Sequence, residues 1–167
     1  GRERMKVFFT AHSLPISMAR RCDYVVQLQE ACRLVGEGVA LADFELVYQS
    51  RSGPPTQPWL EPDICAAIVA EHAKGRLAHA VIVPIGFISD HMEVIFDLDQ
   101  EARQLCDKLG IQFVRAATVG THPNFITMIR KLILERTAGG EQEVLGSLGP
   151  CADFCPEDCC PPPVRHR

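Results

Sequence analysis

The sequence has no long run of lysine or arginine, and its formal net charge is -4. A nucleic-acid surface usually needs a basic stripe or face, so this composition argues against one. The sequence also has no apolar segment of the roughly 20 residues that a membrane-spanning helix needs. Its best apolar run, residues 80–88, is much shorter and is typical of a buried strand. A small molecule or another protein is therefore the expected partner.

The first residues also lack a secretory signal, because no basic region is followed by an apolar segment and a small-residue cleavage site. We therefore expect a cytoplasmic protein. A core strand is predicted within a few residues of Gly1, which indicates missing upstream sequence unless Met5 is the initiator. With 167 residues, 47% of them hydrophobic, the chain is long enough to bury one core of conventional size.

The eight cysteines form two groups. Members of the first group lie in segments with helical spacing and are best explained as small apolar core residues: Cys22, Cys32, Cys65 and Cys106. Members of the second group crowd the sequence CADFCPEDCC: Cys151, Cys155, Cys159 and Cys160. Four thiols on a Pro-rich segment that cannot form a core favour binding of a metal or an iron-sulfur cluster. Zinc stays an alternative, although adjacent cysteines strain a tetrahedral site.

Short strands and helices are predicted to alternate along the first four fifths of the chain. The expected strands, apolar on both sides, are residues 5–11, 44–48, 80–85 and 111–114. The segments with helical spacing are residues 24–35, 64–69, 95–109 and 125–133. Such alternation predicts an α/β fold with a four-stranded parallel sheet that is doubly wound, with helices on both faces. The expected strand order is the flavodoxin-like 2-1-3-4.

The periodic pattern stops after Arg136, where glycines lead into the cysteine cluster and then into a run of prolines. We therefore divide the chain into an α/β domain, residues 1–137, and an irregular tail, residues 138–167. The tail is rich in Gly, Pro and Cys and is the expected ligand segment for a cluster.

Polar side chains gather where the first and third predicted strands end. His12 follows the first strand, and Asp90, His91 and Glu93 follow the third. Ligands of open α/β sheets bind at this edge, so these side chains should face one crevice. On the next helix, Glu93, Asp97 and Glu101 recur every fourth residue. Such a stripe is usually a solvated face, but near an imidazole it suits a divalent metal such as Fe(II).

The loops beside this edge carry more apolar side chains than a surface normally exposes: Leu14, Ile16, Met18, Phe87 and Ile88. A Pro-rich loop, YQSRSGPPTQPWLEPD, follows the second strand and carries the only tryptophan, Trp59. These features favour a flat, apolar ligand.

Three motifs together resemble the ferrochelatase family: FTAHSLP, QSRSGP with PWLEPD, and PIGFISDHMEVIFDLD. They occur in the family's order at three successive strand ends, and the resemblance covers residues 5–136. It implies the C-terminal half of a lyase-class metal chelatase, which inserts ferrous iron into a porphyrin, coproporphyrin III or protoporphyrin IX, in haem biosynthesis. The tail further resembles actinobacterial members that act on coproporphyrin III and carry a 2Fe-2S cluster.

The resemblance also implies roles for individual residues. His12 would meet the porphyrin nitrogens as proton acceptor or iron ligand, and Glu93 would be its partner across the macrocycle. Asp97 and Glu101 match an acidic path that binds or relays the metal. The residues that match the porphyrin pocket and its surroundings are Ser13, Leu14, Trp59, Phe87, Asp90 and His91.

Family members contain two such domains with the porphyrin cleft between them. We therefore expect a missing N-terminal half, or a second copy as in single-domain cobalt chelatases, to complete the cleft. Cluster-bearing relatives take one ligand from the N-terminal half, so three of the four tail cysteines would suffice. Two other functions stay open: a cobalt or nickel chelatase of a sirohydrochlorin-like ring, and a non-catalytic iron-sulfur or zinc-binding module.

Overall fold

The computed structural model describes residues 4–41, 43–54, 56–154 and 157 of the chain. Its four strands form one parallel sheet with the order β2-β1-β3-β4, which confirms the expected topology. The strands are β1 (Met5–His12), β2 (Phe44–Gln49), β3 (His79–Val83) and β4 (Gln112–Arg115). Each lies within two residues of its predicted bounds.

The helices are α1 (Ile16–Ala19), α2 (Tyr24–Gly38), α3 (Ile64–Ala73), α4 (Met92–Val94), η2 (Ile95–Ala102), α5 (Arg103–Leu109) and α6 (Pro123–Ala138). From α4 to α5 the helix is continuous, and its middle section, η2, is a π-helix. The periodicity predicted an α-helix there. A π-helix has i→i+5 hydrogen bonds and occurs often at functional sites.

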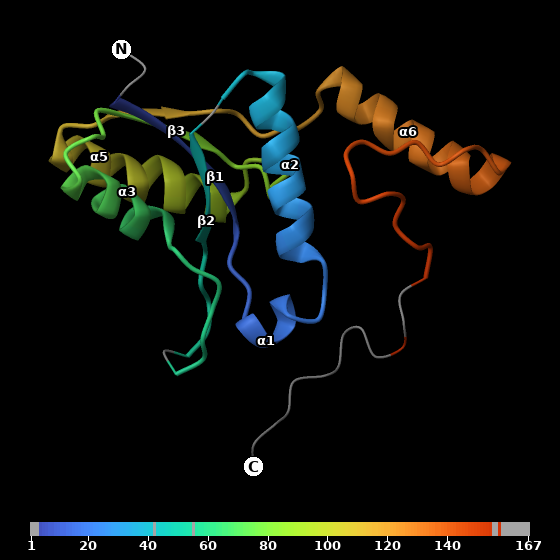
Figure 1. Ribbon diagram of the computed structural model, residues 1–167, viewed down its shortest axis with the longest axis horizontal. Helices are drawn as coiled ribbons and strands as arrows, with labels where there is room; N and C mark the ends of the chain where they lie inside the picture. The colour runs from blue at the N-terminus through green and yellow to red at the C-terminus, as the bar shows by residue number, and fades with distance from the viewer. Residues whose placement is uncertain (1–3, 42, 55, 155–156, 158–167) are drawn as a thin grey trace.

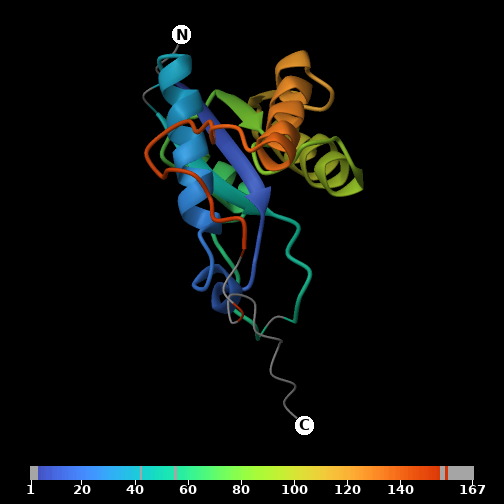
Figure 2. The same ribbon diagram turned by 90° about the vertical axis from the view of Figure 1, so that its right-hand side faces the viewer.

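The central strand β1 separates two layers of helices, because successive side chains of a strand point to opposite faces. Phe8 packs with Ile64 of α3 and Leu98 of η2 on one face. Phe9 packs with Cys32 of α2 on the other. Figures 1 and 2 show α2 on one side of the sheet and α5 on the other. The sheet is thus doubly wound, as expected.

A close approach of the loop after β3 to the end of β1 shapes the edge where the strands end. The backbone N–H of Gly86, just after β3, donates to the carbonyl of Thr10 at 3.0 Å. A Cβ added at Gly86 would lie 2.6 Å from the Cβ of Ala11, so only glycine fits without displacement. The following segment, which carries Phe87, Asp90 and Glu93, is thereby held against the end of β1.

Helix α6 extends beyond the sheet (Figure 1), and none of its residues is buried. It ends at Ala138, where Gly139 adopts the left-handed conformation with φ of 66°. The chain then runs back across α2 (Figure 2), where the backbone N–H of Ser147 donates to Oε1 of Glu30 at 2.6 Å. Among the described residues, no helix combines the length and apolar character needed to span a membrane.

Candidate functional site

His12 and Glu93 lie together at the carboxyl edge of the sheet. His12 ends β1, Glu93 lies in α4, and Nε2 of the imidazole is 3.7 Å from Oε1 of the carboxylate. Both side chains are accessible, with 30% and 50% of their surface exposed. The sequence placed these residues in one crevice, and the structure brings them into contact distance.

The orientation of the imidazole is fixed by its other nitrogen. Nδ1 of His12 lies 2.6 Å from the carbonyl oxygen of Ser13. A carbonyl oxygen can only accept a hydrogen bond, so Nδ1 carries a proton. The neutral ring therefore has its lone pair on Nε2, the atom that faces Glu93. Such a nitrogen can accept a proton or bind a metal.

The residues that follow His12 hold it in place. Ser13 is buried; its N–H donates to the carbonyl of Gln49 at 2.8 Å, and its hydroxyl donates to the carbonyl of Leu60 at 2.9 Å. The carbonyl of the half-buried Leu14 accepts from the N–H of Leu60 at 2.9 Å. With its hydroxyl engaged in this way, Ser13 ties the loop after β1 to the Pro-rich loop.

Trp59 and Phe87 are both only 8% exposed. The indole of Trp59 lies against Gly53, where an added Cβ would be 2.4 Å from Cζ2, and its Nε1 has no partner among the described residues. The Phe87 ring meets the His91 ring edge to face, with centroids 5.3 Å apart. His91 in turn accepts the N–H of Glu93 on Nδ1 at 3.3 Å and begins α4. Phe87 and His91 thus support the backbone of Glu93.

The three carboxylates of the acidic stripe have different surroundings. Asp97 accepts hydrogen bonds on Oδ2 from Nε2 of Gln49, at 3.2 Å, and from the hydroxyl of Ser50. Asp97 and Glu101 line a cavity of about 460 Å³ together with Gln49 and Cys65. Glu93 faces His12 instead. The stripe therefore runs from the imidazole into a side cavity of the same edge.

Asp90 belongs to an ion-pair cluster and not to the group around His12. Arg115, at the end of β4, lies 3.1 Å from Asp90 and 2.7 Å from Asp99. Burial alone would raise the pKa of the Asp90 carboxyl, but hydrogen bonds from Arg115 and Thr118 hold it below its usual range. Sequence reasoning missed Arg115 and Asp99, although Arg115 ends a strand at the same edge of the sheet.

Three of the four helical cysteines fit the expected role. Burial raises the pKa of the Cys32 and Cys106 thiols to about 11, and it raises that of the half-buried Cys65 to about 12 with Asp63 adding to the effect. The prediction was wrong for Cys22, which is exposed in the turn before α2. Its spacing with the apolar residues of α2 was misleading because the helix begins only at Tyr24.

The predicted cluster ligands fall mostly beyond what the structure describes. Cys151 is exposed, and its Sγ lies 3.7 Å from Nε2 of Gln27 on α2. Cys155, Cys159 and Cys160 lie outside the described residues. Within the described ranges, no three histidine, cysteine, aspartate or glutamate side chains gather as a metal site.

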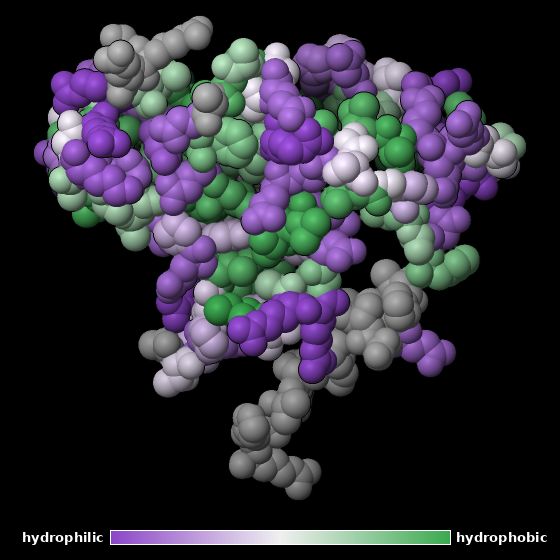
Figure 3. Space-filling model, in the orientation of Figure 1, coloured by the Kyte–Doolittle hydropathy of each residue, from purple (hydrophilic) through white to green (hydrophobic). Residues whose placement is uncertain are grey.

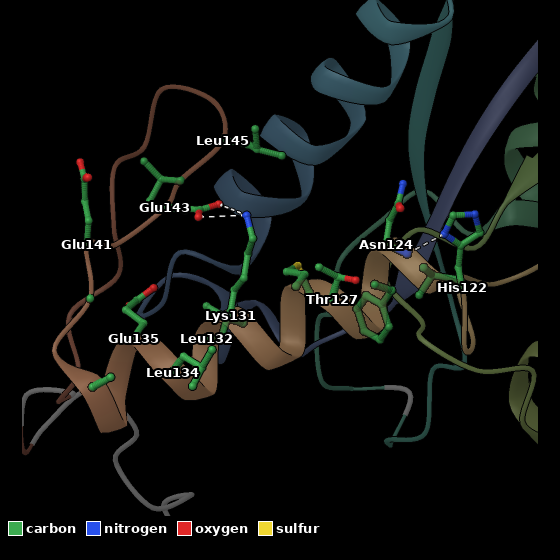
Figure 4. A pocket seen from close by; sticks show the side chains of 16 residues that line it. His122, Asn124, Thr127, Lys131, Leu132, Leu134, Glu135, Glu141, Glu143 and Leu145 are labelled. Carbon is green, nitrogen blue, oxygen red and sulfur yellow. Dashed lines mark hydrogen bonds and ion pairs between the residues drawn. The ribbon is translucent and has the colours of Figure 1, made fainter.

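A larger cavity, of about 950 Å³, lies elsewhere, between α6 and the segment that follows it (Figure 4). Phe125, Met128 and Leu132 of α6 line it, together with Leu145 from the returning segment. An ion pair between Lys131 and Glu143, 2.6 Å apart, joins its two sides. The residues that the sequence predicted as catalytic or metal-binding do not line this cavity.

A solved structure shares this fold. The putative cobalamin (vitamin B12) biosynthesis CbiX protein from Marinobacter aquaeolei VT8 superposes with a TM-score of 0.55 at 18% sequence identity. The similarity covers 81% of this chain and 96% of that one. At this level of identity, the comparison supports the fold alone.

Proteins found by sequence have a higher identity to this chain than the solved structure does. The ferrochelatase of Rhodopirellula baltica is 56% identical over 158 residues, which are 94% of this chain and 45% of that protein. The coproporphyrin III ferrochelatase of Streptomyces griseus is 43% identical over 173 residues, covering 92% of this chain and 46% of that protein. The chain thus spans less than half the length of these relatives. The model of the family described as Ferrochelatase matches residues 1–137, so the chain belongs to the ferrochelatase family.

Proposed function

We propose that this chain supplies half of an enzyme that inserts ferrous iron into a porphyrin, either coproporphyrin III or protoporphyrin IX, in haem biosynthesis. The observation that carries the proposal is the 3.7 Å approach of the His12 imidazole to the Glu93 carboxylate, both accessible, at the carboxyl edge of the sheet. The name of the Streptomyces griseus relative favours coproporphyrin III.

The chemistry of insertion suits these groups. Two pyrrole protons must leave the macrocycle, and iron must exchange its water ligands for ring nitrogens. Nε2 of His12 can accept a proton, since Nδ1 is already protonated. The Glu93 carboxylate, whose Oε1 lies 3.7 Å from Nε2 of His12, would replace water on an iron ion bound beside the imidazole. Asp97 and Glu101, farther along the same helix, would bring the cation towards Glu93.

Apolar side chains around this edge would hold the macrocycle. Met18, Ile88 and Met92 are exposed, at 56%, 64% and 74%. They lie on the segments that follow β1 and β3, beside His12 and Glu93. A porphyrin is flat and apolar, so contact with these side chains would remove apolar surface from water on both partners.

The test is iron insertion by the complete parent protein, followed anaerobically as loss of porphyrin fluorescence. His12→Ala removes the proton acceptor, and we expect a loss of about 10²–10⁴-fold in kcat. His79→Ala is the matched control, because His79 is exposed and begins β3 at the opposite edge of the sheet. Undiminished activity of the His12 variant, or insertion of cobalt or nickel into a sirohydrochlorin-like ring in preference to iron, would refute the proposal.

We further propose that the remaining half of a longer parent protein completes the cleft. Its support is the length of the relatives, which is more than twice that of the aligned chain. Unpaired thiols at Cys22, Cys32, Cys65 and Cys106 fit a reducing, cytoplasmic location. Porphyrin and ferrous iron are then the small-molecule partners.

The tail would hold a 2Fe-2S cluster through three of Cys151, Cys155, Cys159 and Cys160. The donor set supports this, because thiolates are the usual ligands of such clusters, and the cluster would supply a one-electron redox centre. The test is the absorption and electron paramagnetic resonance spectrum of the anaerobically purified parent protein. Serine variants of the tail cysteines should lose the iron-sulfur signal, and tightly bound zinc in place of iron would contradict the assignment.

A further inference from the structure

We infer that Gln49 is a positioning residue that couples His12 to the acidic helix; this inference rests on the proposed function. Gln49 ends β2 and pairs directly with His12 in the register of β1 and β2. Its carbonyl accepts the N–H of Ser13 at 2.8 Å. The residue is only 1% exposed. The backbone of Gln49 is therefore fixed relative to the imidazole.

The side chain of Gln49 reaches from the sheet to the helical segment that carries the carboxylates. Its Nε2 donates to the backbone carbonyl of Glu93 at 3.4 Å and to Oδ2 of Asp97 at 3.2 Å. One amide group thus joins the strand beside His12 to the residue that faces His12. The distance between the imidazole and the Glu93 carboxylate depends on this link.

Ser50 adds a second donor to the same oxygen of Asp97. Ser50 has a φ of 62°, a left-handed conformation that is uncommon for residues other than glycine. This turn at the end of β2 aims the hydroxyl at the helix. Gln49 and Ser50, which also line the side cavity, together hold Asp97 on its wall.

The amide oxygen of Gln49 makes it possible to test a positioning role of this residue separately from a role in stability. Oε1 of Gln49 is buried and has no hydrogen-bond partner among the described residues. A buried, unpaired acceptor disfavours folding, so an apolar side chain of similar shape removes this penalty, which offsets the loss of the two hydrogen bonds that Nε2 donates. What the apolar side chain removes is the link to Glu93 and Asp97.

The test compares Gln49→Met with the unchanged enzyme in the complete parent protein. Methionine has a similar length but no donor, so the helix loses its tie to the strand. Because small misplacements of reacting groups slow catalysis strongly, we expect kcat for iron insertion to fall by about 10²-fold. The KM for porphyrin, which the apolar walls govern, should stay within about twofold. The unfolding temperature should change little, because the lost hydrogen bonds and the removed unpaired acceptor oppose each other.

Two further variants sharpen the result. Ser50→Ala removes the other donor to Asp97 and should also lower kcat, but by a smaller factor than Gln49→Met. Gln100→Met is the matched control, because Gln100 is an exposed amide on the same π-helix. It should leave kcat unchanged.

An unchanged kcat in Gln49→Met would overturn the inference. So would a fall in kcat that is accompanied by a matching fall in unfolding temperature, since that outcome assigns Gln49 to folding. His12→Ala in the same assay separates the two proposals. If this variant retains iron insertion, the proposed function fails; if it loses activity while Gln49→Met does not, only the coupling by Gln49 fails.

Discussion

Arg115 joins the end of β4 to two neighbouring segments through ion pairs with Asp90 and Asp99. Its side chain is 14% exposed, and the guanidinium bridges Asp90 and Asp99 with hydrogen bonds of 2.7–3.3 Å. Arg115→Met would leave two carboxylates close together without their cation. We expect a loss of about 2 kcal/mol in the free energy of unfolding, measured by urea denaturation at neutral pH. Lys108→Met, an exposed cation on α5, is the control and should change little.

The pH dependence of this difference follows from Asp90, whose folded pKa lies below its ordinary value of 3.8. A lowered carboxyl pKa contributes stability that is present above the unfolded value and is lost as the pH falls through the folded one. The gap between the unchanged chain and Arg115→Met should therefore be full at neutral pH and shrink below pH 3.8. A gap that grows in acid would contradict this account.

Individual site residues were predictable where strand ends and charge pointed to them. His12 and Glu93 were placed in one crevice because neighbouring parallel strands present their ends together, and the two side chains do lie 3.7 Å apart. Their catalytic roles remain proposals. Gln49 was missed because an uncharged amide carries no signal of its own. Its partners, Glu93 and Asp97, are 44 and 48 residues away and become neighbours only through the fold.

At the scale of elements, α3 illustrates a helix whose start is fixed by one side chain. Oδ1 of Asp63 accepts the N–H groups of Cys65 and Ala66 at 2.8 and 3.2 Å. Asp63→Ala removes this cap and should cost about 1 kcal/mol of unfolding free energy. Asp63→Asn retains a capping oxygen and should restore most of that loss. Equal losses in the two variants, measured by thermal unfolding, would contradict a capping role.

The π-helix η2 shows that the spacing of apolar residues predicts a helix but not its hydrogen-bond pattern. A helix was predicted over residues 95–109 because its apolar residues return every three or four positions, and the helix is there. That spacing does not distinguish i→i+4 from i→i+5 hydrogen bonds over two turns. The choice depends on contacts from elsewhere in the fold, such as those of Gln49 and Ser50 with Asp97. Strand order, in contrast, was predicted correctly, because right-handed crossovers leave few possible orders and the flavodoxin-like order is one of them.

At the scale of the whole molecule, α6 has an apolar surface that the sheet does not cover. Apolar side chains also interrupt the polar surface between α2 and α6 (Figure 3). Six large apolar side chains of α6 are exposed: Ile126, Met128, Ile129, Leu132, Ile133 and Leu134. Of these, Ile126, Ile129 and Ile133 recur at helical spacing and do not line the cavity beside the returning segment. We propose that the remaining half of the parent protein packs on this stripe.

Replacing Ile129 and Ile133 together by glutamate tests this proposal. These side chains are 39% and 57% exposed in the chain alone, so the unfolding free energy of the 167-residue chain should change by less than about 0.5 kcal/mol. In the complete parent protein, the same substitutions would bury two charges at the interface between the halves. We therefore expect lower thermal stability and faster proteolytic cleavage between the halves there. Thr127→Glu is the control, because Thr127 is exposed on α6 and lines the cavity beside the returning segment instead of the stripe. Unchanged stability of the complete protein would contradict the docking of the other half on α6, and a dimer of the isolated chain that the isoleucine variants dissociate would assign the stripe to a second copy instead.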